Sequence, residues 1–229
     1  MIFMISNTSK QEILEPDKLQ IFLDKIREFI LDHKREIAVA VIAVLGIAAA
    51  IGGWAYYRQS RENEAMNLYN RAVLSVTRPA MMNQEVTAIV QPFKEVTEKY
   101  PGTEAAALSR YRIGNAYLNA NRFDDALPAF REFLKERGGD TELSVLAYNS
   151  LGNCYQGKKD YQNALVNYER ALKLRSGSPF AGDILANMAR NFEAQNDRNK
   201  AREMYEKALE KIRDPAMKLL ISRKIAMLG

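Results

Sequence analysis

The stretch YNSLGNCYQGKKDYQNALVNYERAL, residues 148–172, decides the fold of this chain. In it, Leu151-Gly152-x-x-Tyr155 is followed by Ala164 and Tyr168 on a frame that returns upstream and downstream. The aromatic residue in the second half of the frame marks the period, with intervals of 37, 38 and 37 residues between Phe93, Phe130, Tyr168 and Tyr205. A fixed period of this size indicates helical units that bury their apolar faces by stacking on one another.

The repeated residues resemble the tetratricopeptide repeat, whose first helix carries Leu-Gly-x-x-Tyr and whose second helix carries Ala-x-x-x-Phe/Tyr-x-x-Ala. Small residues let the two helices approach closely: Gly114, Gly152 and Ala189 on the first helix, and Ala126, Ala164 and Ala201 on the second. The period exceeds the usual length of about 34 residues, which predicts inter-repeat turns about three or four residues longer. The resemblance implies an all-α helical solenoid.

A second feature is the segment IAVAVIAVLGIAAAIGGWAYY, residues 37–57, which contains no charged residue and no Asn, Gln, Ser or Thr. A helix of this length covers the hydrocarbon core of a bilayer, which is about 30 Å thick. Trp54, Tyr56 and Tyr57 lie together at one end of the segment, as in the aromatic belt at a membrane interface. A buried core helix and a cleavable signal peptide are the alternatives. The apolar run continues past the one plausible cleavage site, Ala48-Ala49-Ala50, and we therefore expect a retained transmembrane anchor.

Basic residues near the ends of this segment predict its orientation. Residues 17–36 hold five Lys or Arg, and residues 58–77 hold three. By the positive-inside rule, the N-terminus lies in the cytoplasm. In a bacterium the chain would then be a single-pass protein of the inner membrane, with its C-terminal domain in the periplasm.

The part of the chain before the apolar segment divides at Glu15-Pro16-Asp17. We expect an irregular lead over 1–15 and then an amphipathic helix with these apolar residues at helical spacing: Leu19, Phe22, Leu23, Ile26, Phe29 and Ile30. Three interpretations of this helix stay open: it lies on the membrane surface, it contacts a cytosolic partner, or it simply leads into the span. Net charge over 1–36 is −1, from six basic and seven acidic residues, so adhesion to anionic lipid would be weak.

These features divide the chain into five segments. They are a cytoplasmic tail with an amphipathic helix (1–36), a transmembrane helix (37–57), a linker helix with a degenerate repeat (58–103), three tetratricopeptide repeats (104–214) and a C-terminal capping helix (215–229). The expected fold class is therefore all-α, a single transmembrane helix followed by a tetratricopeptide-repeat solenoid.

The composition argues against catalysis and cofactors. The chain has one histidine, His33, and one cysteine, Cys154, whereas a structural zinc site needs about four such ligands and a Cys–His or Ser–His pair needs a well-placed histidine. The sequence contains no Gly-rich phosphate-binding motif. Basic residues over 58–229 are dispersed (27 basic, 21 acidic), which does not favour nucleic-acid binding. We expect no enzyme activity, cofactor or metal, and we expect Cys154 to be a small buried hydrophobe.

Tetratricopeptide arrays bind partners along the concave face, which is lined by the first helix of each pair. In the frame of this chain the candidate peptide-binding residues are Tyr111, Asn115, Asn119, Asn149, Asn153 and Arg190. Asparagine carries both donor and acceptor groups and can hold the backbone of an extended peptide. Asparagine is also common in the background of the repeat, so ancestry is the alternative explanation. Tyr111 and Asn149 stand where a two-carboxylate clamp needs Lys or Arg, which argues against that specific activity.

The whole layout resembles the bacterial ancillary subunit of the SecYEG translocon. The shared features are a cytosolic amphipathic lead, one anchor ending in Trp-x-Tyr-Tyr-Arg-Gln at 54–59, and a helix with Ala65 and Leu68-Tyr69 before degenerate repeats. The resemblance implies a scaffold beside the translocation channel that pairs with a membrane-anchored periplasmic chaperone of the prolyl isomerase type. Two alternatives remain: a scaffold for envelope assembly or cell division, and a holdase chaperone that binds unfolded clients directly.

Overall fold

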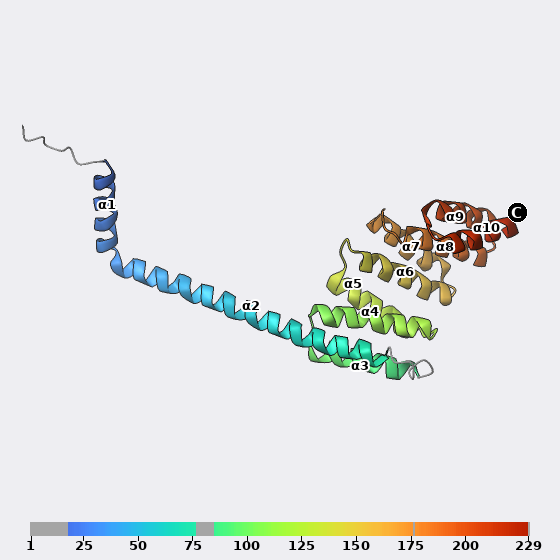
Figure 1. Ribbon diagram of the computed structural model, residues 1–229, viewed down its shortest axis with the longest axis horizontal. Helices are drawn as coiled ribbons and strands as arrows, with labels where there is room; N and C mark the ends of the chain where they lie inside the picture. The colour runs from blue at the N-terminus through green and yellow to red at the C-terminus, as the bar shows by residue number, and fades with distance from the viewer. Residues whose placement is uncertain (1–17, 77–84, 176, 229) are drawn as a thin grey trace, which may run out of the picture. The chain divides into compact units, whose positions relative to one another are not determined.

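The computed structural model describes residues 18–76, 85–175 and 177–228. Within these ranges the chain forms ten α-helices and no strand, which confirms the all-α class (Figure 1). The chain divides into two units, Met1–Tyr57 and Arg58–Gly229. The irregular lead expected over 1–15 lies outside the described residues, as does Gly229 at the end of the expected capping helix.

The first unit contains α1 (Lys18–Asp32) and the beginning of α2 (Lys34–Val76). In the described part of the chain, α2 is the one helix long and apolar enough to cross a membrane by length and composition. The mean hydropathy of its most apolar 18-residue window is 2.4, and none of that window is buried. Ile42 is 69% exposed and Leu45 is 63% exposed. An apolar helix with such exposed side chains is typical of a segment that lies in lipid or against a partner.

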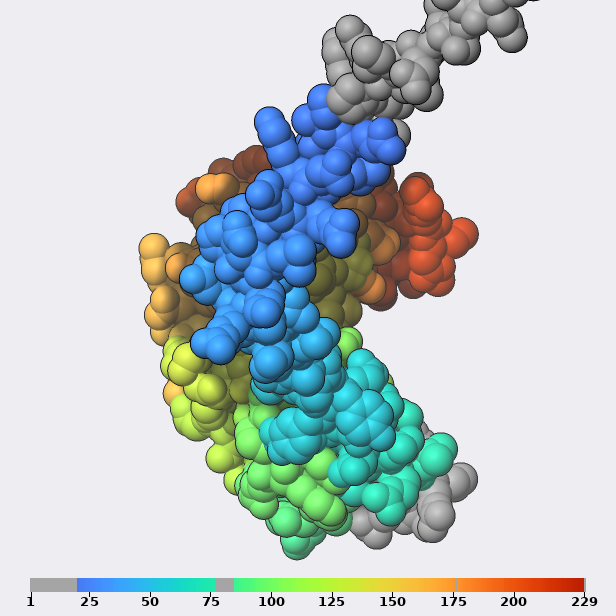
Figure 2. All heavy atoms as spheres, turned by 90° about the vertical axis from the view of Figure 1, so that its left-hand side faces the viewer, coloured from blue at the N-terminus to red at the C-terminus, as the bar shows by residue number. Residues whose placement is uncertain are grey.

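The second unit begins with the last part of α2, from Arg58, and continues through eight more helices. These are α3 (Val86–Lys99), α4 (Glu104–Asn119), α5 (Phe123–Arg137), α6 (Glu142–Gly157), α7 (Tyr161–Leu174), α8 (Ala181–Ala194), α9 (Arg198–Lys211) and α10 (Pro215–Leu228). The helices pack as consecutive pairs, α4 with α5, α6 with α7 and α8 with α9, and α10 packs on α9. Figure 2 shows this unit as a curved body that runs from the green of α3 and α4 to the orange and red of α9 and α10.

Two buried clusters form most of the core of the second unit, and α6 contributes to both. Leu151 and Cys154 of α6 belong to the cluster that includes α4 and α5. Val145 of the same helix belongs to the cluster that includes α7, α8 and α9. A helix pair in this unit therefore completes its core only against its neighbours, as in other solenoids.

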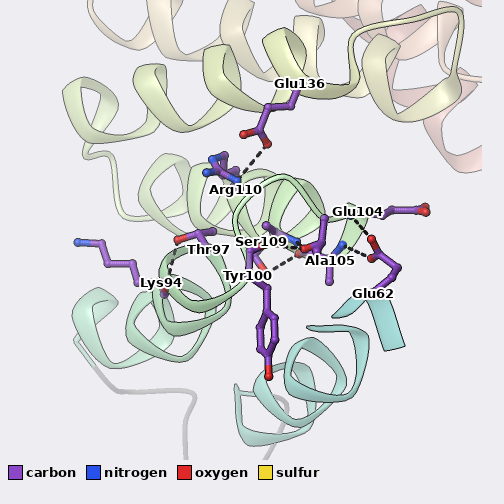
Figure 3. A network of polar contacts seen from close by, with 11 residues as sticks. Glu62, Lys94, Thr97, Tyr100, Glu104, Ala105, Ser109, Arg110 and Glu136 are labelled. Carbon is purple, nitrogen blue, oxygen red and sulfur yellow. Dashed lines mark hydrogen bonds and ion pairs between the residues drawn. The ribbon is translucent and has the colours of Figure 1, made fainter. Parts of the chain in front are cut away.

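Polar contacts around the N-terminus of α4 join the last part of α2 to the repeats (Figure 3). The carboxylate of Glu62 accepts the backbone N–H groups of Glu104 at 2.9 Å and Ala105 at 3.1 Å. Thr103 caps the same helix by accepting the N–H of Ala106 at 3.1 Å. These three bonds satisfy donors that a helix leaves free at its start, and the negative charge of Glu62 lies at the positive end of the helix dipole. Together with the burial of Ala65 on α2, they make this part of α2 integral to the solenoid.

Residues without a side chain determine how closely paired helices approach. A methyl group at Gly114 of α4 would lie 2.8 Å from Cε1 of Phe130 on α5. A methyl group at Gly152 of α6 would overlap the ring of Tyr168 on α7. Phe130 and Tyr168 are both completely buried, so neither ring has room to move aside.

Replacement of Gly152 should therefore destabilise the second unit. We expect Gly152→Ala to lower the free energy of unfolding by about 1–3 kcal/mol, because the overlap with Tyr168 outweighs the better helix propensity of alanine. Denaturant titration of the full-length protein in detergent, followed by circular dichroism, measures this change. Gly139→Ala is the matched control, since a methyl group there meets nothing within 4 Å. Equal stability of the two variants would contradict the close-approach argument.

The turn inside each pair has one backbone geometry repeated three times. Asn121, Lys159 and Asn196 have φ angles of 56°, 61° and 62°, in the left-handed region. In the middle turn the N–H of Lys159 donates to the carbonyl of Gln156, and the N–H of Asp160 donates to the carbonyl of Tyr155, both at 2.9 Å. This pattern is a Schellman motif, which ends a helix with a left-handed residue.

The residue after each left-handed position is the N-cap of the next helix. Asp160 accepts the backbone N–H of Asn163 at 3.2 Å, and Asp197 accepts that of Lys200 at 3.1 Å. The hydrogen bond from the Asn163 side chain and that from the Asn163 N–H hold the pKa of Asp160 below its usual range. Both aspartates are N-caps of the kind that stabilises a helix start.

Lys159 is the one of the three left-handed residues that is neither asparagine nor glycine, and its Cβ strains the turn. We expect Lys159→Gly to raise the free energy of unfolding by about 1 kcal/mol, measured by the same denaturant titration. Lys158→Gly is the control, because Lys158 has a right-handed φ of −79° and gains nothing from glycine. A loss of stability in Lys159→Gly comparable to that in Lys158→Gly would contradict the strain argument.

Candidate functional site

The predicted groove residues lie on α4, α6 and α8, the first helices of three successive pairs. α4 packs against α6, and α6 packs against α8. Helices on the inner side of a superhelix approach one another most closely, so this row forms the concave side of the second unit.

A chain of carboxamide contacts joins α6 to α8 on this side. Nδ2 of Asn187 donates to Oδ1 of Asn149 at 2.8 Å, and the guanidinium of Arg190 donates to Oδ1 of Asn187. Asn187 is 6% exposed, whereas Arg190 is exposed. The two asparagines therefore hold each other's orientation across the boundary between two repeats, and Arg190 keeps its cation in contact with solvent.

The hydroxyl of Tyr168 organises two more carboxamides. Its oxygen lies 2.8 Å from Oδ1 of Asn153 and 2.7 Å from Oε1 of Gln156. A hydroxyl has one proton to donate, so the two carboxamide oxygens share a single donor. Burial raises the pKa of Tyr168, so the hydroxyl stays protonated at neutral pH.

An open hollow of about 420 Å³ lies beside these contacts. Its lining comes from the turn after α4, the start of α5 and the inner faces of α6 and α8: Asn121, Phe123, Asn153, Gln156, Gly157, Asn187 and Arg190. We call this set the carboxamide hollow. It offers neutral donors and acceptors, one aromatic ring and one cation, which are the groups that bind a peptide backbone together with a polar or acidic side chain.

The structure brings three of the six predicted residues together at this place. Asn153 and Arg190 line the hollow, and Asn149 bonds to Asn187 in its wall. The other three lie on α4, away from the lining. Tyr111 is half-buried, with its ring 5.8 Å from that of Phe130 and 5.6 Å from that of Phe133, so it contributes to packing between α4 and α5. Asn115 is half-buried and Asn119 is exposed at the end of α4.

Five lining residues are not among the six predicted ones: Asn121, Phe123, Gln156, Gly157 and Asn187. Asn187 lies one position beyond the residue of α8 that is equivalent to Asn149, so the repeat frame does not select it. Asn121 belongs to a turn, where asparagine is explained by its left-handed φ of 56°. Phe123 is the first residue of α5, outside the first-helix positions that the frame examines.

In the part of the chain that the structure describes, no group of three or more His, Cys, Asp or Glu could hold a metal ion. Cys154 follows Asn153 in sequence but is completely buried, and desolvation raises the pKa of its thiol to about 12. The thiol is therefore protonated at neutral pH and shielded from reagents.

Stacked helix pairs with a polar hollow on their inner row define a helical-repeat protein of the interaction-scaffold class. The family model of the tetratricopeptide repeat-like domain matches residues 27–229, and the chain belongs to this family. Domains of this family bind other proteins and are typically not enzymes.

Solved structures support the same fold. A crystal structure of the MamA protein is 16% identical, with a TM-score of 0.56 over 74% of this chain and 81% of that chain. The TPR-like repeats of a kinesin light chain from Podosopora anserina are 15% identical, with a TM-score of 0.53 over 74% of this chain and 84% of that chain. No curated protein matches the sequence. At these identities the likeness is one of fold.

The role of Tyr168 can be tested by removing its hydroxyl alone. We expect Tyr168→Phe to lower the free energy of unfolding by about 1 kcal/mol, because Asn153 and Gln156 lose a shared hydrogen-bond partner. The preceding repeat already has phenylalanine at this place, Phe130, so the ring itself fits. Chemical denaturation of full-length protein measures the change. Unaltered stability would show that the two carboxamides are equally well satisfied by water.

Proposed function

We propose that this protein is a membrane-tethered scaffold whose repeat domain binds protein partners. The tether is the apolar segment 37–57 of α2, acting as a retained single span. The exposure of its apolar side chains supports this, because a core helix of the same composition would be buried. The family match also begins at residue 27, so it includes this segment as well as the repeats.

The proposed topology places the N-terminus in the cytoplasm and the repeat domain in the periplasm of a bacterium with an inner membrane. Its support is the distribution of basic residues, five in 17–36 against three in 58–77.

The carboxamide hollow is the observation that carries the binding proposal. Its side chains are held in place by bonds among Asn149, Asn187 and Arg190 before any ligand arrives. Prepositioned amides lose little conformational freedom on binding, and they match the alternating donors and acceptors of an extended peptide. The exposed guanidinium of Arg190 adds a preference for a carboxylate on that peptide.

The particular partner that we propose is the SecYEG translocon, with the protein acting as an ancillary subunit. In this role it would link the channel to a membrane-anchored periplasmic chaperone of the prolyl isomerase type, and it would catalyse nothing itself. The support is the resemblance in layout, an anchor ending in aromatic residues at 54–57 followed by the repeats. A scaffold for envelope assembly or cell division, and a direct holdase, are the competing functions.

Photo-crosslinking in the protein's own membranes tests the site and the partner together. A photoreactive amino acid replaces Asn153 in the hollow, or Glu169 on the exposed side of α7 as the matched control. We expect mass spectrometry to recover channel subunits and a periplasmic isomerase from position 153, and only background from position 169.

The other outcomes separate the alternatives. Recovery of division or outer-membrane assembly factors alone would replace the translocon proposal with the envelope scaffold. Recovery of many unrelated secreted chains would favour the holdase. Equal capture from both positions would reject the hollow as the binding site.

A further inference from the structure

The helix α1 carries an apolar face that stays largely exposed in the described structure, where the ring of His33 stacks on one of its members, Phe29. Its five large side chains are between 40% and 60% exposed: Phe22, Leu23, Ile26, Phe29 and Ile30. At about 100° per residue these five positions fall within an arc of about 120° on the helix. We call this set the apolar arc. It is as wide as the stripe by which an amphipathic helix contacts an apolar phase.

The charges of α1 are sorted around this arc. Lys25 and Arg27 each lie about 40° beyond one of its two edges, and Asp24 and Glu28 lie on the opposite side, each about 20° from the pole. Asp32 follows near the end of the helix, and Ile21 and Leu31 are the apolar side chains of α1 outside the arc. Cations therefore border the apolar face on both sides, and the side farthest from it holds Asp24 and Glu28 together with Ile21 and Leu31, which each lie about 40° from the pole.

This arrangement matches the layers of a phospholipid surface. A helix lying flat in the interface places its apolar face among the acyl chains, and its edges then meet the phosphate groups. Lysine and arginine at the edges reach those phosphates while their stems stay in the apolar layer, and acidic groups at the pole remain in water. A groove on a protein partner has no reason to require cations on both borders.

The position of α1 in the chain brings it to such a surface. α1 ends at Asp32, and the uncharged segment begins at Ile37, so four residues separate the helix from the proposed span. At 1.5 Å per residue this distance is about 6 Å. The ring of His33 stacks on Phe29 with centroids 4.5 Å apart. His33 is the one residue between the bounds of α1 and α2, which are two separate helices (Figure 1).

We propose that α1 lies flat on the bilayer that segment 37–57 crosses, with the apolar arc in lipid and Lys25 and Arg27 at the level of the phosphates. The inference rests on the proposed membrane tether. Over 18–32 three basic residues balance three acidic residues, so the apolar arc drives the contact. Zwitterionic phosphatidylcholine is therefore sufficient.

Spin labels in full-length protein reconstituted into phosphatidylcholine vesicles test this placement. The buried Cys154 is replaced by alanine, and single cysteines carry the label at Ile26→Cys in the arc, Glu28→Cys opposite it, or Leu45→Cys in the span. The readout is the ratio of collisions with oxygen, which dissolves in lipid, to collisions with a water-soluble nickel chelate. We expect this ratio to be several-fold higher at position 26 than at position 28, and highest at position 45.

The outcomes distinguish this inference from the tether on which it rests. Equal ratios at positions 26 and 28, with position 45 in lipid, would overturn the placement of α1 and leave the span intact. This is also the result expected if the arc serves a protein partner, which the vesicles lack. A water-exposed label at position 45 would reject the tether itself.

A variant of unchanged composition tests the flanking charges. Asp24→Lys combined with Lys25→Asp moves a cation from the edge of the arc to the pole and a carboxylate from the pole to the edge. We expect the label at position 26 to become shallower, with a ratio closer to that at position 28. An unchanged ratio would overturn the role assigned to the basic residues at the edges.

Discussion

The second unit depends on one steric constraint, which is that an aromatic ring on one helix occupies the space where its partner helix has no side chain. Phe130 lies against Gly114, and Tyr168 lies against Gly152. This contact brings the two helices of a pair together. It thereby determines which side of the first helix faces the concave side of the second unit. The side chains of Asn149, Asn153 and Arg190 gain their common direction from that orientation. A binding surface in this solenoid is therefore a consequence of how its core is packed.

Much of the fold could be predicted from the sequence because the constraint repeats at a fixed period. The glycines and aromatic rings recur every 37 or 38 residues, and such a period has few structural solutions. The carboxamide hollow was harder to predict from the sequence. The bond between Asn149 and Asn187 depends on the rotation between successive pairs, which period alone does not specify. Tyr111 occupies an inner-row position in the frame, yet its ring packs against Phe130 and Phe133, because a large side chain there reaches the core of its own pair.

The two units differ in how far their apolar side chains are buried. In the second unit small residues and rings pack on neighbouring helices, and Ala65 and Glu62 extend this packing and capping back into α2. In the first unit Phe22, Ile26 and Leu45 remain open in the described structure. We propose that lipid surrounds these side chains. We propose that the inner row of the repeats binds protein ligands. One chain would thereby tether a binding domain to a membrane.

The burial of Cys154 has a consequence for the chemical lifetime of the protein. A lone accessible thiol in an oxidising compartment forms mixed disulfides or covalent dimers, since it has no partner within its own chain. The thiol of Cys154 is enclosed where α6 meets the preceding repeat. It escapes oxidation for as long as that contact is closed, and it becomes available to oxidants when α6 separates from α4 and α5. Disulfide-linked dimers of this chain would therefore record past opening of the repeats.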